Sequence, residues 1–245
     1  MDDNLRVVVA AAGTGSRMGS RINKQYLLLN NRPVLAYSLD LFEQYDPIDE
    51  VVIVAKSTEV GFCEQEIVSK YNYRKVSRVV AGGSERQDSV WAGLNHLDEH
   101  TAYVAVHDGA RPLLSLELLD SLYREARQWG AAIPGVLARD TLKMVDRDSF
   151  VGHTLDRTSV IAVQTPQIFQ YDELKKAYQE AYHDNFQATD DASLFERYIG
   201  RVKVVAGLYD NLKITTPEDI IIAEGLLQAR RHSKGDKEYA HRHRL

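Results

Sequence analysis

The sequence predicts a doubly wound α/β fold, in which helices cover both faces of a mostly parallel β-sheet and a β-hairpin arm protrudes from it. Short, continuous apolar runs of strand length recur along the chain, and amphipathic stretches of helical length separate most of them. Strands that alternate with helices in this way form parallel sheets covered on both sides. The 245 residues, of which 44% are hydrophobic and 27% charged, suffice for one domain with a substantial core.

The predicted strands are rich in valine and isoleucine, as expected where both faces of a strand are buried. In chain order they are residues 5–10, 51–55, 76–80, 103–106, 131–136 and 202–206. The helices predicted between them cover residues 34–45, 59–71, 88–97, 115–128 and 172–182. A last helix is expected to start at Thr216 and Pro217, because threonine caps helix N-termini and proline suits the first turn.

One segment, about residues 139–165, breaks the alternation of strands and helices. Residues 141–145 and 150–154 have the composition of short strands and flank the turn-prone residues 146–149. We therefore predict a hairpin arm that projects from the sheet. Such an arm is too small to bury a core of its own, so we expect it to pack on a partner subunit, and packing back onto its own domain is the alternative.

Composition and charge exclude several classes of protein. Cys63 is the only cysteine, so no intrachain disulfide can form and no cysteine-based metal site is expected. The net charge of −5 argues against general affinity for nucleic acid, and no signal peptide or membrane span is recognisable, so we expect a cytoplasmic protein. Residues 1–228 are expected to form a single domain, followed by a charged, flexible tail over residues 229–245.

The loop from Ala10 to Lys24, after the first strand, is the first candidate binding site. Arg17 and Lys24 are cations in this loop, and small residues there let backbone N–H groups approach a phosphate. Those small residues include Ala11, Ala12, Gly13 and Gly15. The glycine spacing and the missing acid after the second strand disfavour an NAD-dependent oxidoreductase, and the loop lacks the Gly-Lys-Ser/Thr ending of an ATPase. A nucleotide phosphate site is favoured over a simple turn.

Two further strand ends carry glycines and polar side chains. Gly83, Ser84 and Ser89 follow the third strand, where free N–H groups and hydroxyls could contact a base or sugar, and helix capping is the alternative. Asp108 and Gly109 end the fourth strand, at the edge of a parallel sheet where ligands bind. The Asp108 carboxylate could hold Mg²⁺ or a ribose there.

Other cations and hydroxyls are candidates for binding an anionic substrate. Arg111 follows the fourth strand and could instead pair with a neighbouring acid. Thr141 lies in the arm, and Arg157 follows its second strand. Lys213 lies just before the last helix, where an ordinary surface lysine is the alternative.

Six motifs, taken in order, resemble those of the 2-C-methyl-D-erythritol 4-phosphate cytidylyltransferase family. They are residues 10–19 with Lys24, then 82–90, 106–112, 164–167, 188–192 and 211–217, which read AAAGTGSRMG, GGSERQDSV, VHDGARP, QTPQ, ATDDA and NLKITTP. The resemblance covers about residues 5–228. It implies a Rossmann-like nucleotidyltransferase fold and a homodimer joined through the arm. It also implies transfer of a cytidylyl group from CTP to methylerythritol phosphate with Mg²⁺, which releases pyrophosphate in non-mevalonate isoprenoid biosynthesis.

The same resemblance implies a role for each matched residue. Arg17 and Lys24 would stabilise the transition state, and Asp108 could bind a Mg²⁺ held mainly by the CTP phosphates. The residues that would position the sugar phosphate are Arg157, Lys213, Thr141, Thr165 and Arg111. The residues that would contact CTP are Ala11, Ala12, Gly13, Gly15, Gly83, Ser84, Ser89, Asp108 and Gly109.

The residue types agree with this chemistry. A phosphate monoester has a second pKa near ~6 and attacks in its ionised form, so the reaction needs fixed cations rather than a strong base. Ribitol-5-phosphate cytidylyltransferase is the nearest alternative, although its His-Asp-Ala-Val-Arg-Pro differs from this chain at Gly109 and Ala110. A nucleotide sensor without turnover is a further alternative, which the retained cations disfavour.

Overall fold

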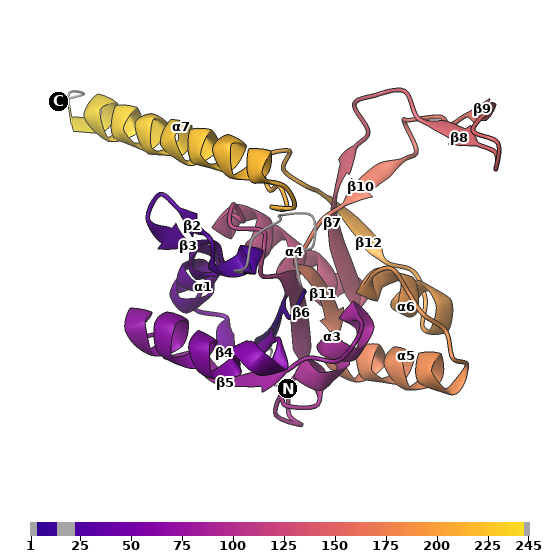
Figure 1. The fold of residues 1–245 in the computed structure, drawn as a ribbon, viewed down its shortest axis with the longest axis horizontal. Coiled ribbons are helices and arrows are strands. Elements are labelled where there is room, and N and C mark those ends of the chain that lie inside the picture. Colours follow the sequence, from indigo (N-terminus) through magenta and orange to yellow (C-terminus); the bar gives the residue numbers. More distant parts are fainter. Residues whose placement is uncertain (1–3, 14–22, 243–245) are drawn as a thin grey trace.

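The computed structural model describes residues 4–13 and 23–242, with side chains as far as Arg230. Its centre is an eight-stranded sheet in the order β10-β7-β11-β6-β1-β4-β5, with β12 paired to β7 (Figure 1). The strands are β1 (Leu5–Ala11), β4 (Ile48–Ala55), β5 (Val76–Ala81), β6 (Tyr103–Asp108), β7 (Ala131–Leu137), β10 (Ile161–Val163), β11 (Gln167–Gln170) and β12 (Lys203–Ala206). Two-residue strands β2 (Leu28–Leu29) and β3 (Arg32–Pro33) form a separate small hairpin.

The mostly parallel sheet that the sequence predicts is confirmed. Strand β1 pairs in parallel with β4 and β6, β4 with β5, and β7 with β12. Strands β10 and β11 run antiparallel to their neighbours and have no counterpart among the predicted strands. They are short, and β11 contains two glutamines, so their apolar pattern is too weak to indicate a strand.

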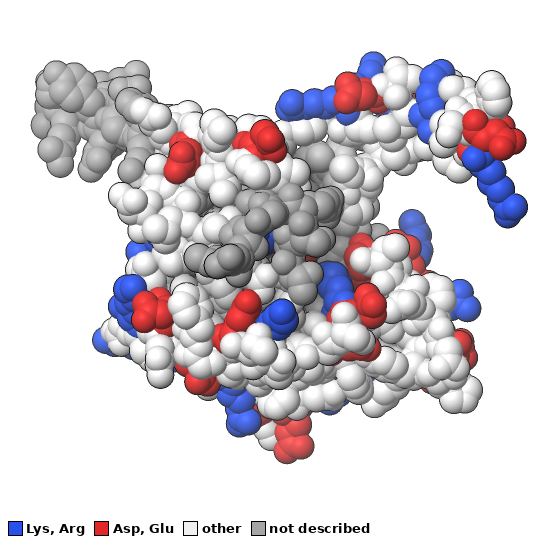
Figure 2. Space-filling model, viewed as in Figure 1, with Lys and Arg blue, Asp and Glu red and all other residues white. Residues whose placement is uncertain are grey.

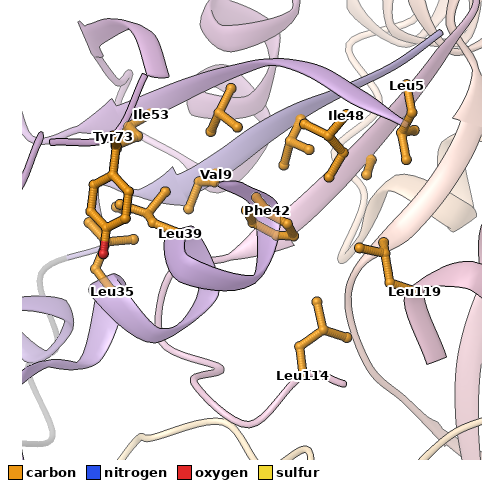
Figure 3. Close-up of a cluster of buried hydrophobic side chains, with 14 of the residues drawn as sticks. Leu5, Val9, Leu35, Leu39, Phe42, Ile48, Ile53, Tyr73, Leu114 and Leu119 are labelled. Atoms are coloured by element: carbon orange, nitrogen blue, oxygen red, sulfur yellow. The ribbon is translucent and has the colours of Figure 1, made fainter. Parts of the chain in front are cut away.

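Helices cover both faces of the sheet, as predicted. On one face lie α1 (Val34–Gln44), α2 (Val60–Phe62) with the π-helix Cys63–Ser69, and α4 (Leu116–Trp129). On the other lie α3 (Arg86–Leu94), α5 (Tyr171–His183) and α6 (Asp191–Tyr198), of which α6 was not predicted. Because side chains alternate along a strand, Val7 and Val9 of β1 join the first core, which Figure 3 shows around Phe42, and Val8 joins the second.

The helix ends follow from their capping residues. The Ser115 hydroxyl accepts a hydrogen bond from the Leu118 N–H at 3.2 Å and starts α4, and Gly130 ends it with φ of 83°. The Asp190 carboxylate accepts from the Ser193 N–H at 3.0 Å and starts α6. These hydrogen bonds determine the residues at which α4 and α6 begin.

The predicted arm is present as an antiparallel hairpin of β8 (Lys143–Val145) and β9 (Val151–Thr154). It stands away from the body of the protein, so packing back onto its own domain is excluded (Figures 1 and 2). Apolar side chains nevertheless cover part of it: Phe150 is 71% exposed and Val151 61% exposed. An exposed apolar hairpin of this kind is typical of a segment that packs on another molecule.

The last helix, α7 (Pro217–Arg242), begins where the sequence predicts. Its start is fixed by Asp219, whose carboxylate accepts from the N–H groups of Thr215 and Thr216 at 2.7 and 2.8 Å. The segment from residue 229, for which we predict a charged, flexible tail, is helical as far as Arg242. The reason is its alanine, lysine, glutamate and arginine content and its lack of proline, which favour helix. Within the described ranges, no helix has both the length and the apolar character needed to cross a bilayer.

Candidate active site

A cavity of about 510 Å³ lies where strands β1, β4, β5 and β6 end. Strand β1 is central, with β4 and β5 on one side and β6 on the other, which is the position where ligands bind in open α/β sheets. The cavity is lined by Ala10, Ala11, Ala12, Gly13, Lys24, Gln25, Lys56, Ser57, Gly82, Gly83, Ser84, Glu85, Arg86, Ser89, Asp108, Ala110 and Lys213. We call it the nucleotide cavity, after the ligand that the sequence motifs predict for its lining residues.

The sequence explains how this cavity keeps its shape. The side chain of Gln25 is buried and donates a hydrogen bond to the Ala11 carbonyl, which anchors the turn carrying Lys24 to the end of β1. At Gly82, a Cβ atom would lie 2.6 Å from both the Ala12 Cβ and the Ser89 Oγ. Only glycine permits the end of β5 to approach the end of β1 this closely.

A second cavity, of about 450 Å³, lies beside the first, and we call it the acceptor cavity, after the substrate that the sequence motifs predict for several of its lining residues. It is lined by Arg86, Asp108, Arg111, Ile133, Val163, Gln164, Thr165, Gln167, Thr189, Asp190, Ala192, Ser193, Glu196 and Lys213. Arg86, Asp108 and Lys213 line both cavities and therefore form a shared wall. Groups bound in the two cavities would meet at this wall.

The carboxylate of the shared wall lies among three cations, of which Arg86 and Lys213 belong to the wall and Arg111 lines only the acceptor cavity. The Asp108 Oδ2 lies 2.7 Å from the Lys213 Nζ and 3.8 Å from the Arg111 Nε, and its Oδ1 lies 3.5 Å from the Arg86 Nε. Burial alone would raise the pKa of Asp108, but the charges of Arg86 and Lys213 outweigh burial and hold it well below its usual range. Asp108 is therefore ionised, and the wall has an excess of positive charge.

A buried hydrogen-bond network holds the backbone of Asp108 and the side chain of its neighbour His107. The Thr165 hydroxyl oxygen accepts from the Asp108 N–H at 3.0 Å and lies 3.2 Å from the His107 Nδ1. The His107 Nε2 lies 3.1 Å from the Ser38 hydroxyl, which donates to the Arg111 carbonyl at 3.0 Å. A neutral ring with its proton on Nε2 satisfies all these contacts. Burial lowers the pKa of His107 to about 4, in agreement with a neutral ring.

The structure brings most of the predicted site residues together. Nine of them line the nucleotide cavity: Ala11, Ala12, Gly13, Lys24, Gly83, Ser84, Ser89, Asp108 and Lys213. Thr165 and Arg111 line the acceptor cavity, and Asp108 and Lys213 line both.

Other predicted residues lie elsewhere. Gly109 does not line the nucleotide cavity, and its N–H donates to the Ala10 carbonyl at 2.9 Å. Arg17 and Gly15 fall outside the described residues. Thr141 and Arg157 belong to the segment that carries the arm, are exposed, and line neither cavity. The Arg157 guanidinium donates to the Arg139 carbonyl at 3.0 Å.

Sequence reasoning missed several cavity residues. Lys56 and Ser57, which follow β4, line the nucleotide cavity. In the sequence, this loop argues only against a dinucleotide site, because it lacks an acidic residue there. Arg86 lies within the GGSERQDSV motif, but its position on the shared wall depends on contacts with β6 and α6. In the sequence, the one indication that Arg86 belongs to the site is its position just after Gly82 and Gly83, near a predicted helix start. Helix capping, the alternative for this segment, is also present, because the Asp88 carboxylate accepts a hydrogen bond from the Glu85 N–H at 3.1 Å.

Among the described residues, no group of three or more His, Cys, Asp or Glu side chains could hold a metal ion. Asp108 is one carboxylate facing the nucleotide cavity, and its oxygens already contact cations. Mg²⁺ is commonly bound by one or two carboxylates together with substrate phosphates and water. The residues present fit a magnesium ion held mainly by a nucleotide, and they do not fit one held by the protein alone.

Comparison with known proteins decides the family. The family model described as 2-C-methyl-D-erythritol 4-phosphate cytidylyltransferase matches residues 5–229. The chain belongs to this family. Relatives in the 2-C-methyl-D-erythritol 4-phosphate cytidylyltransferase family include proteins of that name from Alkaliphilus metalliredigens, 46% identical over 92% of this chain and 93% of the relative, and from Pelotomaculum thermopropionicum, 46% identical over 93% and 96%.

Solved structures of the family have the same fold. A 4-diphosphocytidyl-2C-methyl-D-erythritol synthase from Anaerococcus prevotii has a TM-score of 0.82 and 34% identity, covering 93% of this chain and 100% of that one. A 2-C-methyl-D-erythritol 4-phosphate cytidylyltransferase from Francisella tularensis has a TM-score of 0.77 and 33% identity, covering 90% and 98%. Because these coverages are nearly complete, the shared fold extends over nearly the whole chain.

Proposed function

We propose that this chain transfers the cytidylyl group of CTP to 2-C-methyl-D-erythritol 4-phosphate, giving 4-diphosphocytidyl-2-C-methyl-D-erythritol and pyrophosphate. The observation that carries the proposal is the cationic wall shared by two cavities at the ligand edge of the sheet. Family membership supplies the identity of the two substrates. A cytoplasmic location is part of the proposal, because a single buried, free cysteine suits a reducing compartment.

In this reaction a phosphate oxygen of the acceptor forms a bond to the α-phosphorus of CTP. The bond from that phosphorus to the oxygen bridging to the β-phosphate breaks, and its electron pair leaves with pyrophosphate. The repulsion between the two anions and the charge growing on the α-phosphate are the main barriers. Arg17 and Lys24 would stabilise that charge from the nucleotide side, and Lys213 and Arg111 would hold the acceptor phosphate beside it.

We propose Mg²⁺ as the metal, bound by the CTP phosphates with Asp108 as the protein carboxylate within reach. When bound, it would neutralise phosphate charge and favour departure of pyrophosphate. Ala11, Ala12, Gly13 and Gly83 leave room for backbone N–H groups to contact the nucleotide, as the small residues at this edge suggest. Ser84 and Ser89 offer hydroxyls on the same side.

Release of pyrophosphate from CTP tests the function directly. Purified protein with CTP and Mg²⁺ is expected to release pyrophosphate with 2-C-methyl-D-erythritol 4-phosphate and at least about 100-fold more slowly with ribitol 5-phosphate, because a polar acceptor site rejects a mismatched pattern of hydroxyls. The reverse preference would replace the proposal by the ribitol phosphate activity. CTP binding without turnover on either acceptor would indicate a nucleotide sensor.

We also propose a homodimer in which the arm of each subunit brings Thr141 and Arg157 to the acceptor cavity of the other. Two observations support it: these residues line neither cavity of their own subunit, and the arm exposes Phe150 and Val151. Phe150→Asp is expected to shift the full chain from dimer to monomer in sedimentation. The matched control is Leu116→Gln, which changes an exposed apolar residue on α4.

Mixing two inactive variants tests the exchange of residues between subunits. Lys24→Ala and Arg157→Ala chains are unfolded and refolded together, so that about half of the dimers contain one of each. If Arg157 acts across the interface, one site in each mixed dimer has both residues, and about a quarter of the wild-type activity returns. If Arg157 acts within its own subunit, no site is complete and the mixture stays inactive.

A further inference from the structure

Arg86, which begins α3, is the least explained residue of the shared wall. Its guanidinium is attached at two points: the Nη2 lies 2.7 Å from the Asp191 Oδ2, and the Nε lies 3.5 Å from the Asp108 Oδ1. The side chain is 30% exposed, and it lines both cavities. Its free surface therefore faces the space where the two substrates would meet.

Asp191 holds Arg86 from the side of the protein core. Its side chain is completely buried and lines neither cavity. The Asp191 Oδ1 accepts a hydrogen bond from the Tyr178 hydroxyl at 2.5 Å, and Tyr178 is itself buried between α5 and the sheet. A buried carboxylate is costly unless it is paired, so Asp191 constrains the position of its cationic partner strongly.

Asp108 is consequently held at both of its carboxylate oxygens. Lys213 and Arg111 contact its Oδ2, and Arg86 contacts its Oδ1. A continuous chain of polar contacts thus leads from Tyr178 through Asp191 and Arg86 to the carboxylate on the wall. Small displacements of reacting groups are known to cost large factors in rate. The arrangement suits a residue that fixes the geometry of the wall.

We propose that Arg86 is a positioning residue for cytidylyl transfer, which Asp191 holds in place and which fixes Asp108 between the nucleotide and acceptor cavities. The inference rests on the proposed function, since it concerns the step in which the two bound phosphates react. It adds Arg86 and Asp191 to the residues that the sequence motifs indicated. Asp191 would act only through Arg86, and this makes the proposal testable.

The test is a double-mutant cycle with Arg86→Gln, Asp191→Asn and the double variant in the full chain. Pyrophosphate release gives kcat and KM, and calorimetry with CTP gives the affinity and the number of sites per chain. We expect Arg86→Gln to lower kcat about 100-fold. Asp191→Asn is expected to lower it about 10-fold, and the double variant to lose no more than Arg86→Gln alone. KM for CTP should change less than about threefold, because a positioning residue acts mainly on the transfer step.

A purely structural role of the Arg86 and Asp191 pair predicts a different pattern. It would reduce the number of CTP sites per chain and leave the kcat per site within about threefold of the wild type. That result, or losses that multiply in the double variant, would overturn the proposal. Arg124→Gln is the matched control, since Arg124 is 67% exposed on α4 and lines neither cavity. It should leave kcat unchanged.

A milder variant keeps the test valid if the charge-changing variants do not fold. Tyr178→Phe removes one hydrogen bond to Asp191 and no charge, and it is expected to lower kcat about threefold. Arg86→Lys should abolish this effect, because lysine lacks the second arm that reaches Asp191. A Tyr178→Phe effect that persists in Arg86→Lys would count against the proposal. An inactive wild type would refute the proposed function itself, whereas an active wild type with an unaffected Arg86→Gln would refute only the role of Arg86.

Discussion

Replacing Thr165 by valine tests whether this residue supports the wall as well as any substrate. Valine has nearly the same volume but no hydroxyl, so the buried Asp108 N–H loses its acceptor and the His107 Nδ1 loses its donor. An unpaired buried polar group costs about 1–3 kcal/mol. The acceptor cavity adjoins Thr165 and admits water, so values near the lower end apply. We expect a total loss of about 2–4 kcal/mol in the free energy of unfolding.

Urea denaturation followed by circular dichroism measures this loss, with the slope against urea expected to stay constant. Thr165→Ser keeps the hydroxyl and should lose only about 1 kcal/mol for the missing methyl group. Thr141→Val makes the same change on the exposed arm and should stay within about 0.5 kcal/mol of the wild type. If Thr165→Val were as stable as the wild type and raised only the KM of the acceptor, the hydroxyl would serve the substrate alone, and the supporting network would be refuted.

Three further outcomes are expected. The pKa of His107 is about 4 in the folded state and about 6.5 in the unfolded state. As the pH falls, the unfolded state therefore binds a proton at a higher pH than the folded state does. The contribution of neutral His107 to the free energy of unfolding should be fully present above pH 6.5 and fall by roughly 3 kcal/mol towards pH 4. In urea denaturation, His107→Gln should show a weaker dependence of this free energy on pH. Lys24→Ala should lower kcat by about 10²–10³-fold in the pyrophosphate assay while CTP affinity by calorimetry changes little, whereas equal losses would contradict a transition-state role. Chelation of divalent metal should stop pyrophosphate release and leave the urea midpoint of the free protein unchanged, because its described residues provide no cage for a metal ion.

The central parallel strands could be predicted from the sequence because local patterns of apolar residues mark them. The valine-rich strands β1, β4 and β6 are buried on both faces, so they read as continuous apolar runs. The same runs predict where each strand ends, and parallel strands end at the same edge. The sequence therefore predicts that the small residues from Ala11 to Gly13 and the carboxylate of Asp108 lie in one site.

The wall of the acceptor cavity was less predictable because distant contacts build it. Strand β11 lies between β6 and β7 and runs antiparallel to both, which places Thr165 beside His107, 58 residues earlier in the chain. No spacing in the sequence encodes this insertion. Lys213 reaches Asp108 only because the loop before α7 crosses the end of β6, where the Ile214 N–H donates to the Ala110 carbonyl at 2.8 Å.

Asp108 reduces the repulsion among the cations at the shared wall. Arg86, Arg111 and Lys213 would repel one another if they lined the cavities without an anion between them. The carboxylate gathers them while no substrate is bound, and Asp191 neutralises part of the charge of Arg86 from the core side. Cations held in advance need little rearrangement when phosphates arrive, and this is the condition under which fixed charges stabilise a transition state most effectively. Asp108 therefore orients its cationic neighbours in the free protein.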